Sequence, residues 1–289
     1  MAIINIDDLH LATVKINTRN SNGDLGSGTG FIVDFAEGLG GEYTRIPLIV
    51  TNKHVVQGAI EGTVQFHAST KEGTPAGQCK FTIDNFEKYF HIHPSEEVDL
   101  CAMAIAPFFL LAAKDKIKPY YKSLSLEQVM DETGLQNFSA SQEIIVVGYP
   151  NGIWDEVNNL PIFRKGILGT LPSFNYQGKQ EFLIDCAIYP GSSGSPVLAL
   201  EPLFNPKTME MVTSIKLLGV VYATYQHTAQ GTLVIENIPA NFVNTMVPNH
   251  LGLVLKSTRL LELNELIKEY YIGTEAFDPK SEEFHPIKE

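Results

Sequence analysis

The sequence has few of the residues that would suit a disulfide framework, a nucleic-acid surface or a membrane segment. It contains three cysteines, an odd number, and no pair or cluster with metal-ligand spacing. Its 21 Lys and Arg stand against 33 Asp and Glu, and the resulting formal charge of −12 would repel nucleic acids and anionic membranes. Its most apolar run, residues 100–113, contains Pro107 and is too short to cross a bilayer. We therefore expect no nucleic-acid, membrane, metal or cofactor partner.

The N-terminus lacks the features of a secretion signal. Residues 1–8 have no basic region and no apolar core of the kind that a signal peptide needs. Cys79, Cys101 and Cys186 lie in strand-like segments, as buried and reduced thiols do. These features predict a cytoplasmic protein.

Short strand-like runs, by contrast, are abundant. They are separated by glycine-rich connections, and short strands at regular spacing with turn signals predict a barrel or a sandwich. The first six runs are 11–17, 29–34, 48–51, 63–68, 79–85 and 100–105. The second six are 143–147, 162–168, 181–187, 197–200, 214–225 and 232–235.

Helical signals are confined to two places. Residues 107–141 read as a connection with one short helix, where Ser125 and Gln128 have capping-box spacing. Near the C-terminus, residues 256–267 have the apolar spacing of a helix face. The residues of that face are Leu260, Leu263, Leu266 and Ile267.

A glycine-flanked turn at residues 189–197 (YPGSSGSPV) carries the chemistry. A serine hydroxyl is a weak nucleophile at neutral pH and needs a histidine base, an orienting carboxylate and N–H groups aimed at the oxyanion. We interpret Ser193 as the nucleophile, with the N–H groups of Gly191 and Ser193 as the oxyanion hole. The alternative is a purely structural turn, since Gly and Ser are common turn residues. The turn is not the elbow of the α/β-hydrolases, because position 195 is Ser and a strand-like run follows.

A histidine at the end of a strand is the predicted base. His54 follows a β-branched run that ends at Thr51, so the fold would hold it rigidly. His91 and His93 are competing candidates, but neither lies at the end of a clear strand.

The predicted carboxylate is Asp99, which immediately precedes an apolar run. Asp84 competes with it, but alternation along its strand would turn Asp84 to solvent. His54, Asp99 and Ser193 then follow the chain order of the chymotrypsin-like enzymes.

Five motifs, taken in order, resemble the chymotrypsin-fold serine proteases, and within them the bacterial branch of HtrA proteases and glutamyl endopeptidases. The motifs are 26–33 (GSGTGFIV), 51–56 (TNKHVV), 99–100 (DL) with its strand, 146–152 (VVGYPNG) and 185–188 (DCAI). The resemblance covers residues 26–226. Asp99 lies 45 residues after His54, and Ser193 lies 94 residues after Asp99, which suits one barrel supplying His and Asp and a second supplying Ser.

The resemblance implies an all-β fold of two six-stranded antiparallel β-barrels and a C-terminal helix that packs on the second. Residues 1–117 would form the barrel with His54 and Asp99, residues 118–250 the barrel with Ser193, and residues 251–289 the helix and a tail. This leaves no room for a PDZ domain. The implied function is that of a serine endopeptidase acting on a protein or peptide substrate. The alternatives are an inactive module that acts by binding, and a protease that depends on a regulatory protein partner.

The resemblance also suggests a substrate specificity. Ala187 would form the base of the S1 pocket, where it offers no acid to a P1 Lys or Arg. The histidine that glutamyl endopeptidases carry after the serine is absent from residues 219–221, unless His227 reaches in from the next loop. An uncharged pocket favours a small or medium apolar P1 residue. Ser192 takes the place of the acid that pairs with a new N-terminus in trypsin-like zymogens, so we expect no activating cleavage.

The residues after the pocket strand are expected to bind the substrate through their backbone. Tyr222, Ala223 and Thr224 would pair with the substrate as an added antiparallel strand. Ala223 and Thr224 replace glycines that would keep the pocket wide.

Overall fold

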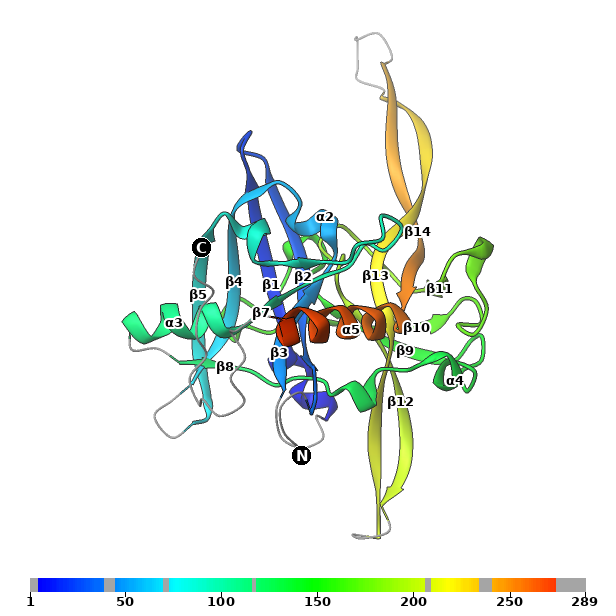
Figure 1. Ribbon diagram of the computed structural model, residues 1–289. Helices are drawn as coiled ribbons and strands as arrows, with labels where there is room; N and C mark the ends of the chain where they lie inside the picture. Colours follow the sequence, from blue (N-terminus) through cyan, green and yellow to red (C-terminus); the bar gives the residue numbers. More distant parts are fainter. Residues whose placement is uncertain are drawn as a thin grey trace.

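The computed structural model describes residues 5–38, 45–69, 73–115, 118–205, 209–233 and 241–273, which form two β-sheets and a C-terminal helix (Figure 1). The all-β class, the two-sheet architecture and the C-terminal helix are confirmed. None of the helices in this part of the chain is long and apolar enough to cross a membrane.

The first sheet follows the hydrogen-bonded order β5-β4-β1-β2-β3-β7-β6, and β8 pairs with β4. It has eight strands where six were predicted, because β6 and β8 have two residues each and are too short to leave a periodic signal. Its strands are β1 (Thr13–Asn20), β2 (Leu25–Phe35), β3 (Ile46–Thr51), β4 (Ala59–Ser69), β5 (Pro75–Asp84), β6 (His91–Ile92), β7 (Cys101–Ala104) and β8 (Pro119–Tyr120).

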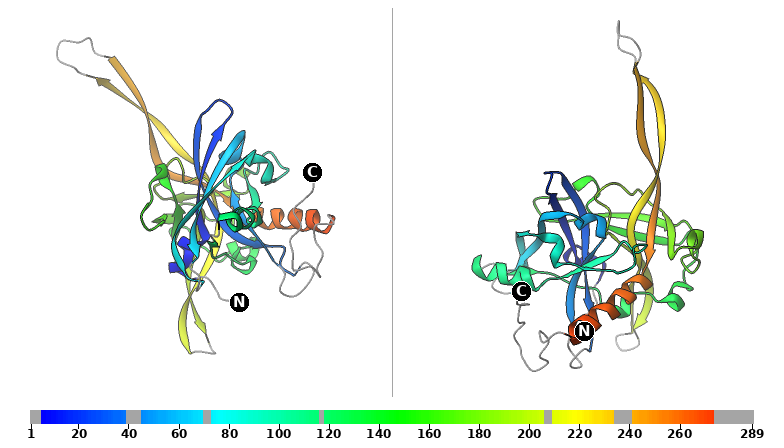
Figure 2. Two further views of the ribbon diagram at one scale, coloured as in Figure 1. Left: turned by 90° about the vertical axis from the view of Figure 1, so that its left-hand side faces the viewer. Right: turned by 45° about the horizontal axis from the view of Figure 1, so that its top comes forward.

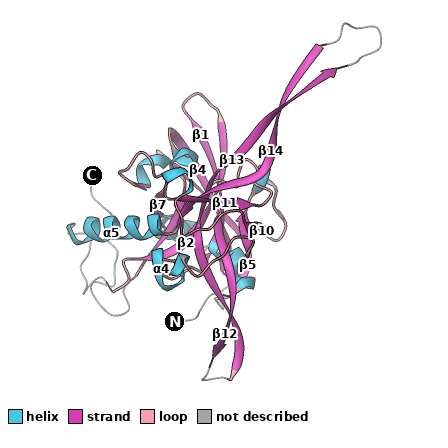
Figure 3. Ribbon diagram, turned by 90° about the vertical axis from the view of Figure 1, so that its right-hand side faces the viewer, coloured by secondary structure: helices cyan, strands magenta, loops and turns pink. Residues whose placement is uncertain are grey.

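The second sheet closes into a barrel in the order β10-β11-β14-β13-β12-β9. Its strands are β9 (Glu143–Gly148), β10 (Ile162–Leu168), β11 (Glu181–Asp185), β12 (Pro196–Asn205), β13 (Glu210–Leu233) and β14 (Asn241–Lys256). Two hairpins, β12–β13 and β13–β14, project from the body in opposite directions (Figures 1 and 3).

The helices are short except for α3 and α5. The α-helices are α1 (Leu9–Ala12), α2 (Lys53–Val56), α3 (Ala106–Asp115), α4 (Glu132–Leu135) and α5 (Thr258–Gly273). The 3₁₀ helices are η1 (Ile6–Asp8), η2 (Phe86–Tyr89), η3 (Leu126–Gln128), η4 (Pro150–Gly152) and η5 (Tyr176–Gly178). The predicted cap of η3 is confirmed, since Oε1 of Gln128 accepts from the Ser125 N–H at 3.1 Å.

Two sequence predictions about elements were wrong, and the position of α5 adds a contact that was not predicted. The sixth strand of the second barrel is β14 and not the run predicted at residues 232–235. Residues 232 and 233 belong to β13, residues 234 and 235 lie outside the described residues, and β14 begins at Asn241. Residues 106–115 form α3, since Pro107 stands in the first turn of the helix, where its missing N–H costs nothing. The helix α5 contacts the first sheet as well as the second barrel, through a hydrogen bond from the Ala36 N–H to Asn264.

Alternation along the strands places β2 and β3 between two apolar clusters. Phe31 and Val33 of β2 pack into a cluster shared with the second barrel and α5, whereas Ile32 packs into the interior of the first sheet. In β3, Leu48 packs into the shared cluster, whereas Ile49 packs into the interior of the first sheet. The first sheet and the second barrel are therefore joined through one apolar cluster to which β2 and β3 contribute.

The predicted domain boundary after residue 117 stays a prediction. β8 follows it directly and pairs with β4 of the first sheet. The predicted tail after residue 273 lies outside the described residues.

Candidate active site

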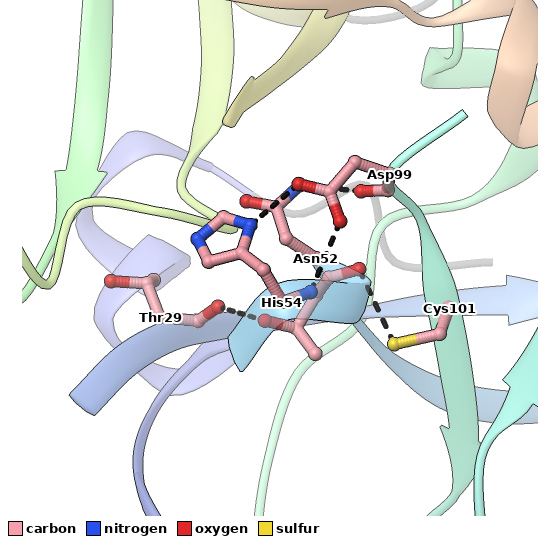
Figure 4. Close-up of polar contacts among 6 residues, drawn as sticks. Thr29, Asn52, His54, Asp99 and Cys101 are labelled. Carbon is pink, nitrogen blue, oxygen red and sulfur yellow. Dashed lines mark hydrogen bonds and ion pairs between the residues drawn. The ribbon is translucent and has the colours of Figure 1, made fainter. Parts of the chain in front are cut away.

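The predicted base and carboxylate lie together at one edge of the first sheet. Nδ1 of His54 donates to Oδ2 of Asp99 at 2.5 Å, and the His54 backbone N–H donates to Oδ1 at 3.1 Å (Figure 4). Since an ionised carboxylate only accepts, the ring proton is on Nδ1, and Nε2 remains an acceptor. The His54 side chain is 46% exposed, so a substrate can reach it.

The register of β3 and β7 explains why His54 and Asp99 lie close together. β3 and β7 are antiparallel, with Thr51 opposite Cys101, so the chain after β3 and the chain before β7 leave the sheet at the same edge. The buried Asn52 then fixes Asp99, because its Nδ2 donates to the Asp99 carbonyl at 2.7 Å (Figure 4). The sequence signalled His54 and Asp99 but not Asn52, whose partner is far away in the chain.

The competing candidates have other surroundings. The ring of His91 packs against the ring of Tyr270, with centroids 4.6 Å apart. His93 is buried, and its Nδ1 accepts from the Ser95 N–H at 3.2 Å. Asp84 is exposed on β5, as alternation predicted.

The serine turn leaves two of its N–H groups unused. Ser192 donates its N–H to the Tyr189 carbonyl at 3.0 Å, and Gly194 donates to Val221 at 2.8 Å. Across the described residues, the N–H groups of Gly191 and Ser193 have no protein acceptor. These are the two groups predicted to form the oxyanion hole.

A neighbouring loop fixes the direction of the Gly191 N–H. The Asn151 N–H donates to the Pro190 carbonyl at 2.5 Å. In a trans peptide the carbonyl and the following N–H point in opposite directions, so the Gly191 N–H points away from Asn151. Nζ of Lys15 in turn donates to the Gly152 carbonyl at 2.9 Å and anchors that loop on the first sheet.

The two glycines of the turn are required by backbone conformation and space. Gly191 has a φ of +88° and Gly194 a φ of +86°, and residues with a side chain rarely adopt such positive values. A Cβ on Gly194 would lie 2.0 Å from the Thr29 carbonyl oxygen, and one on Gly191 would lie 2.5 Å from the Tyr149 carbonyl oxygen. The turn is thus packed directly on the strand that carries Thr29.

Thr29 of β2 joins the serine turn to β3, the strand that precedes the short helix α2 with His54. Its N–H donates to the Ser193 carbonyl at 2.8 Å, and its own carbonyl accepts from the Thr51 hydroxyl at 2.8 Å. Its buried hydroxyl donates to the Gly191 carbonyl at 2.8 Å and accepts from the Tyr149 N–H at 3.1 Å. Sequence analysis missed this residue, although its place inside the motif GSGTGF at the start of a strand was a signal of close packing.

We expect Thr29→Val to destabilise the fold by about 1–3 kcal/mol, because the buried Gly191 carbonyl and Tyr149 N–H would both lose a partner. Urea unfolding would measure the loss. Thr29→Ser keeps the hydroxyl and is the control. An equal loss in both variants would mean that the methyl group, and not the hydrogen bonds, stabilises the site.

The residues predicted to bind substrate lie beside the turn. Ala187 is half-buried, and the adjacent Ile188 is buried. β12 pairs with β13 only as far as Pro196 opposite Val220, so at Ala223 and Thr224 no described strand covers that edge of β13.

Tyr222 also lies on this edge, but its side chain contacts other residues of the protein. Its hydroxyl donates to the buried carboxylate of Glu181, and its ring packs on the shared core. Burial, followed by this hydrogen bond, raises the pKa of Tyr222. Its hydroxyl is therefore already hydrogen-bonded within the protein.

The alternative in which His227 reaches the pocket assumed that it lies in a loop, and this assumption was wrong. β13 continues through His227, which pairs with Val247 of β14. Its side chain is exposed, and its Nδ1 contacts Oδ1 of Asn249.

The cysteines offer no competing nucleophile. All three are buried and free of disulfides. Burial raises the pKa of Cys79 to about 12 and the pKa of Cys101 well above its usual value, so both stay protonated at neutral pH. The described residues contain no group of three or more His, Cys, Asp or Glu that could hold a metal ion.

Comparison with known proteins identifies the family. The family model described as a trypsin-like peptidase domain matches residues 28–201, more than half of the chain. The chain belongs to the trypsin-like peptidase family. This match includes the segments with His54, Asp99 and Ser193, and it makes the protein a protease by family. No curated protein sequence matches the chain.

Several solved structures are similar to this trypsin-like peptidase at low identity. The HtrA-type protease AlgW with a tripeptide has 17% identity and a TM-score of 0.47, and the match covers 92% of this chain and 62% of that one. The active form of the Rv3671c protease from M. tuberculosis has 15% identity and a TM-score of 0.47, covering 95% of this chain and 86% of that one. A mutant of the Tobacco Etch Virus protease has 11% identity and a TM-score of 0.47, covering 96% of this chain and 85% of that one. The chain therefore spans about 62% of the length of the AlgW chain.

Proposed function

We propose that this trypsin-like peptidase is a serine endopeptidase in which Ser193 attacks the scissile carbonyl. The observation that carries the proposal is the His54–Asp99 pair at the end of β3, joined through Thr29 to a serine turn with two unused N–H groups. This combination supplies a base, an orienting carboxylate, a nucleophile and oxyanion donors.

In the proposed first step, Nε2 of His54 takes the proton of the Ser193 hydroxyl as Oγ bonds to the carbonyl carbon. The carbonyl oxygen becomes an oxyanion and accepts hydrogen bonds from the N–H groups of Gly191 and Ser193. Asp99 holds the Nδ1 proton and stabilises the imidazolium.

Collapse of this intermediate expels the amine, which takes the proton from Nε2 of His54, and leaves an ester on Ser193. A water molecule then attacks the ester, with His54 again as the base. Release of the acid regenerates the free serine. The cycle uses only groups of this chain and water.

We propose that substrate pairs in an extended conformation with the open edge of β13 at Tyr222, Ala223 and Thr224. The base of the pocket would be formed by Ala187, beside the buried Ile188. Neither residue can neutralise a charged P1 side chain, so a small or medium apolar P1 residue fits best.

Cleavage of a peptide library tests this function and specificity together. We expect cleavage after residues such as Ala, Val and Leu, with discrimination of about 1–3 kcal/mol per misfitting methylene. Dominant cleavage after Lys, Arg or Glu would contradict the specificity. Absence of cleavage by the purified protein would favour an inactive binding module, and cleavage only after addition of cell lysate would favour a protease that requires a regulatory protein.

A further inference from the structure

The C-terminal helix α5 connects the second barrel to the segment that carries Asp99. The helix follows β14 directly, and at its start the Ser257 N–H donates to the Leu218 carbonyl of β13 at 2.9 Å. It then runs across the molecule to the first sheet (Figures 1 and 2). There Oδ1 of the buried Asn264 accepts from the Ala36 N–H at 2.8 Å.

The far end of α5 packs on β6. Tyr270 and Tyr271 place their rings against His91, with centroids 4.6 and 5.8 Å away. His91 in turn pairs with Ala102 of β7, the strand that follows Asp99. The helix thus contacts the strand on which the 93–99 segment begins.

Nearer the start of α5, Glu262 lies beside His93. Nε2 of His93 is 3.4 Å from Oε2 of Glu262, and both oxygens of Glu262 accept from Nη1 of Arg259, at 2.7 and 2.8 Å. The 3.4 Å contact is an electrostatic one, and Nε2 has no aligned hydrogen-bond partner among the described residues.

The other nitrogen of His93 holds the backbone of the next turn. Nδ1 accepts from the Ser95 N–H at 3.2 Å, so the ring proton is on Nε2 and faces Glu262. Burial lowers the pKa of His93 below its usual value, and the nearby charges of Lys53 and Arg259 lower it further. Glu262 acts in the opposite direction but does not outweigh burial. The lowered pKa keeps the ring neutral, with its proton on Nε2.

From Ser95 the connection to Asp99 is short. The Ser95 carbonyl accepts from the Val98 N–H at 3.2 Å and from Nζ of Lys53, the neighbour of His54, at 2.7 Å. The segment closes where the His93 N–H donates to the Leu100 carbonyl at 3.1 Å. Asp99 lies inside this closed loop, and the ring of His93 is one of the groups that hold it.

We propose that Glu262 of α5 is a positioning residue for the reaction, acting through His93 to hold the loop that presents Asp99 to His54. This inference rests on the proposed function, because it assigns a role in placing a proposed catalytic group. It makes α5 part of the support of the active site, in addition to its contribution to the core.

The test compares three single substitutions in α5, each made in the full chain. We expect Glu262→Ala to lower kcat about 3- to 30-fold with KM unchanged, since substrate contacts are untouched while the loop with Asp99 loses one of its supports and keeps the Asn52 hydrogen bond. Glu262→Gln keeps an oxygen that can face Nε2 and should stay within about twofold of the unaltered protein. Lys268→Ala removes an ion pair with Glu265 on the same helix, 2.9 Å long, and should leave kcat unchanged.

A second comparison separates positioning from helix stability. His93→Asn retains an acceptor for the Ser95 N–H but cannot reach Glu262, so it should lower kcat as Glu262→Ala does. Combined with Glu262→Ala, it should cause no further loss, because both changes break one connection. The strongly deshielded proton NMR signal expected for the His54 Nδ1–H should weaken in each of these variants and persist in Lys268→Ala.

Two outcomes would overturn the inference while leaving the proposed function intact. One is a Glu262→Ala variant with the activity and NMR signal of the unaltered protein. The other is an equal loss of kcat in Glu262→Ala and Lys268→Ala, which would indicate a general effect of helix stability. If the unaltered protein itself is inactive towards peptides and serine-directed reagents, the proposed function fails first.

Discussion

Replacing Ser193 by alanine is expected to lower kcat for peptide hydrolysis by a factor on the order of 10⁴ to 10⁶, with little change in fold stability. The hydroxyl is the proposed nucleophile, so its removal leaves His54 without the proposed group to deprotonate. Steady-state hydrolysis of the best library peptide measures the loss. Circular dichroism and urea unfolding check that the fold is retained.

The matched control is Ser195→Ala, two residues further along the same turn. Ser195 is fully buried, and its Oγ has no hydrogen-bond partner among the described residues. Removal of this hydroxyl should leave kcat unchanged. Full activity in Ser193→Ala, or a comparable loss in Ser195→Ala, would mean that the wrong serine has been assigned.

Asp99→Asn should lower kcat by a factor on the order of 10⁴, the size of effect that this change has in other enzymes with a triad. An amide at this position can offer an N–H to Nδ1 of His54, which would move the ring proton to Nε2. The base would then have no lone pair for the hydroxyl of Ser193. Measurement of kcat across the pH range tests the effect.

Asp84→Asn is the control for the loss of one carboxylate. Asp84 was the competing candidate in the sequence and is exposed on β5. Its replacement should change neither kcat nor KM. A larger effect in Asp84→Asn than in Asp99→Asn would show that the carboxylate has been misassigned.

The parts of the site that could be predicted from sequence are those carried by local patterns. Ser193 lies in a turn whose glycines are needed for a positive φ, and His54 and Asp99 lie at the ends of apolar runs. Such patterns are visible within a short stretch of chain. Alternation also placed Asp84 on the exposed face of its strand, as the structure has it.

The supporting residues could not be predicted, because their partners are far away in the chain. Thr29 forms hydrogen bonds with Tyr149 and Gly191, which lie 120 and 162 positions later in the chain. Asn52 forms a hydrogen bond with Asp99, which lies 47 positions later. Glu262, which contacts His93, lies about 170 positions after it in the chain. A polar residue in a single sequence gives no indication of which distant backbone group it will meet.

The missed elements have different physical reasons. β6 and β8 are held by pairing with β7 and β4 and not by an apolar pattern of their own. Residues 232 and 233 continue β13 and pair with Phe242 and Asn241 of β14, and this pairing between distant segments leaves no local signal that joins them to the run at residues 214–225. The helix α3 lies at the start of the segment predicted as a connection, and its Pro107 is tolerated because it stands in the first turn.

Labelling with a fluorophosphonate, followed by mass mapping of the modified peptide, tests the central claim most directly. The account predicts one adduct per chain, on the peptide that contains Ser193, and its loss in Ser193→Ala and His54→Ala. Ser195→Ala should be labelled as fast as the unaltered protein. An adduct on another residue, or labelling that survives in Ser193→Ala, would contradict the account.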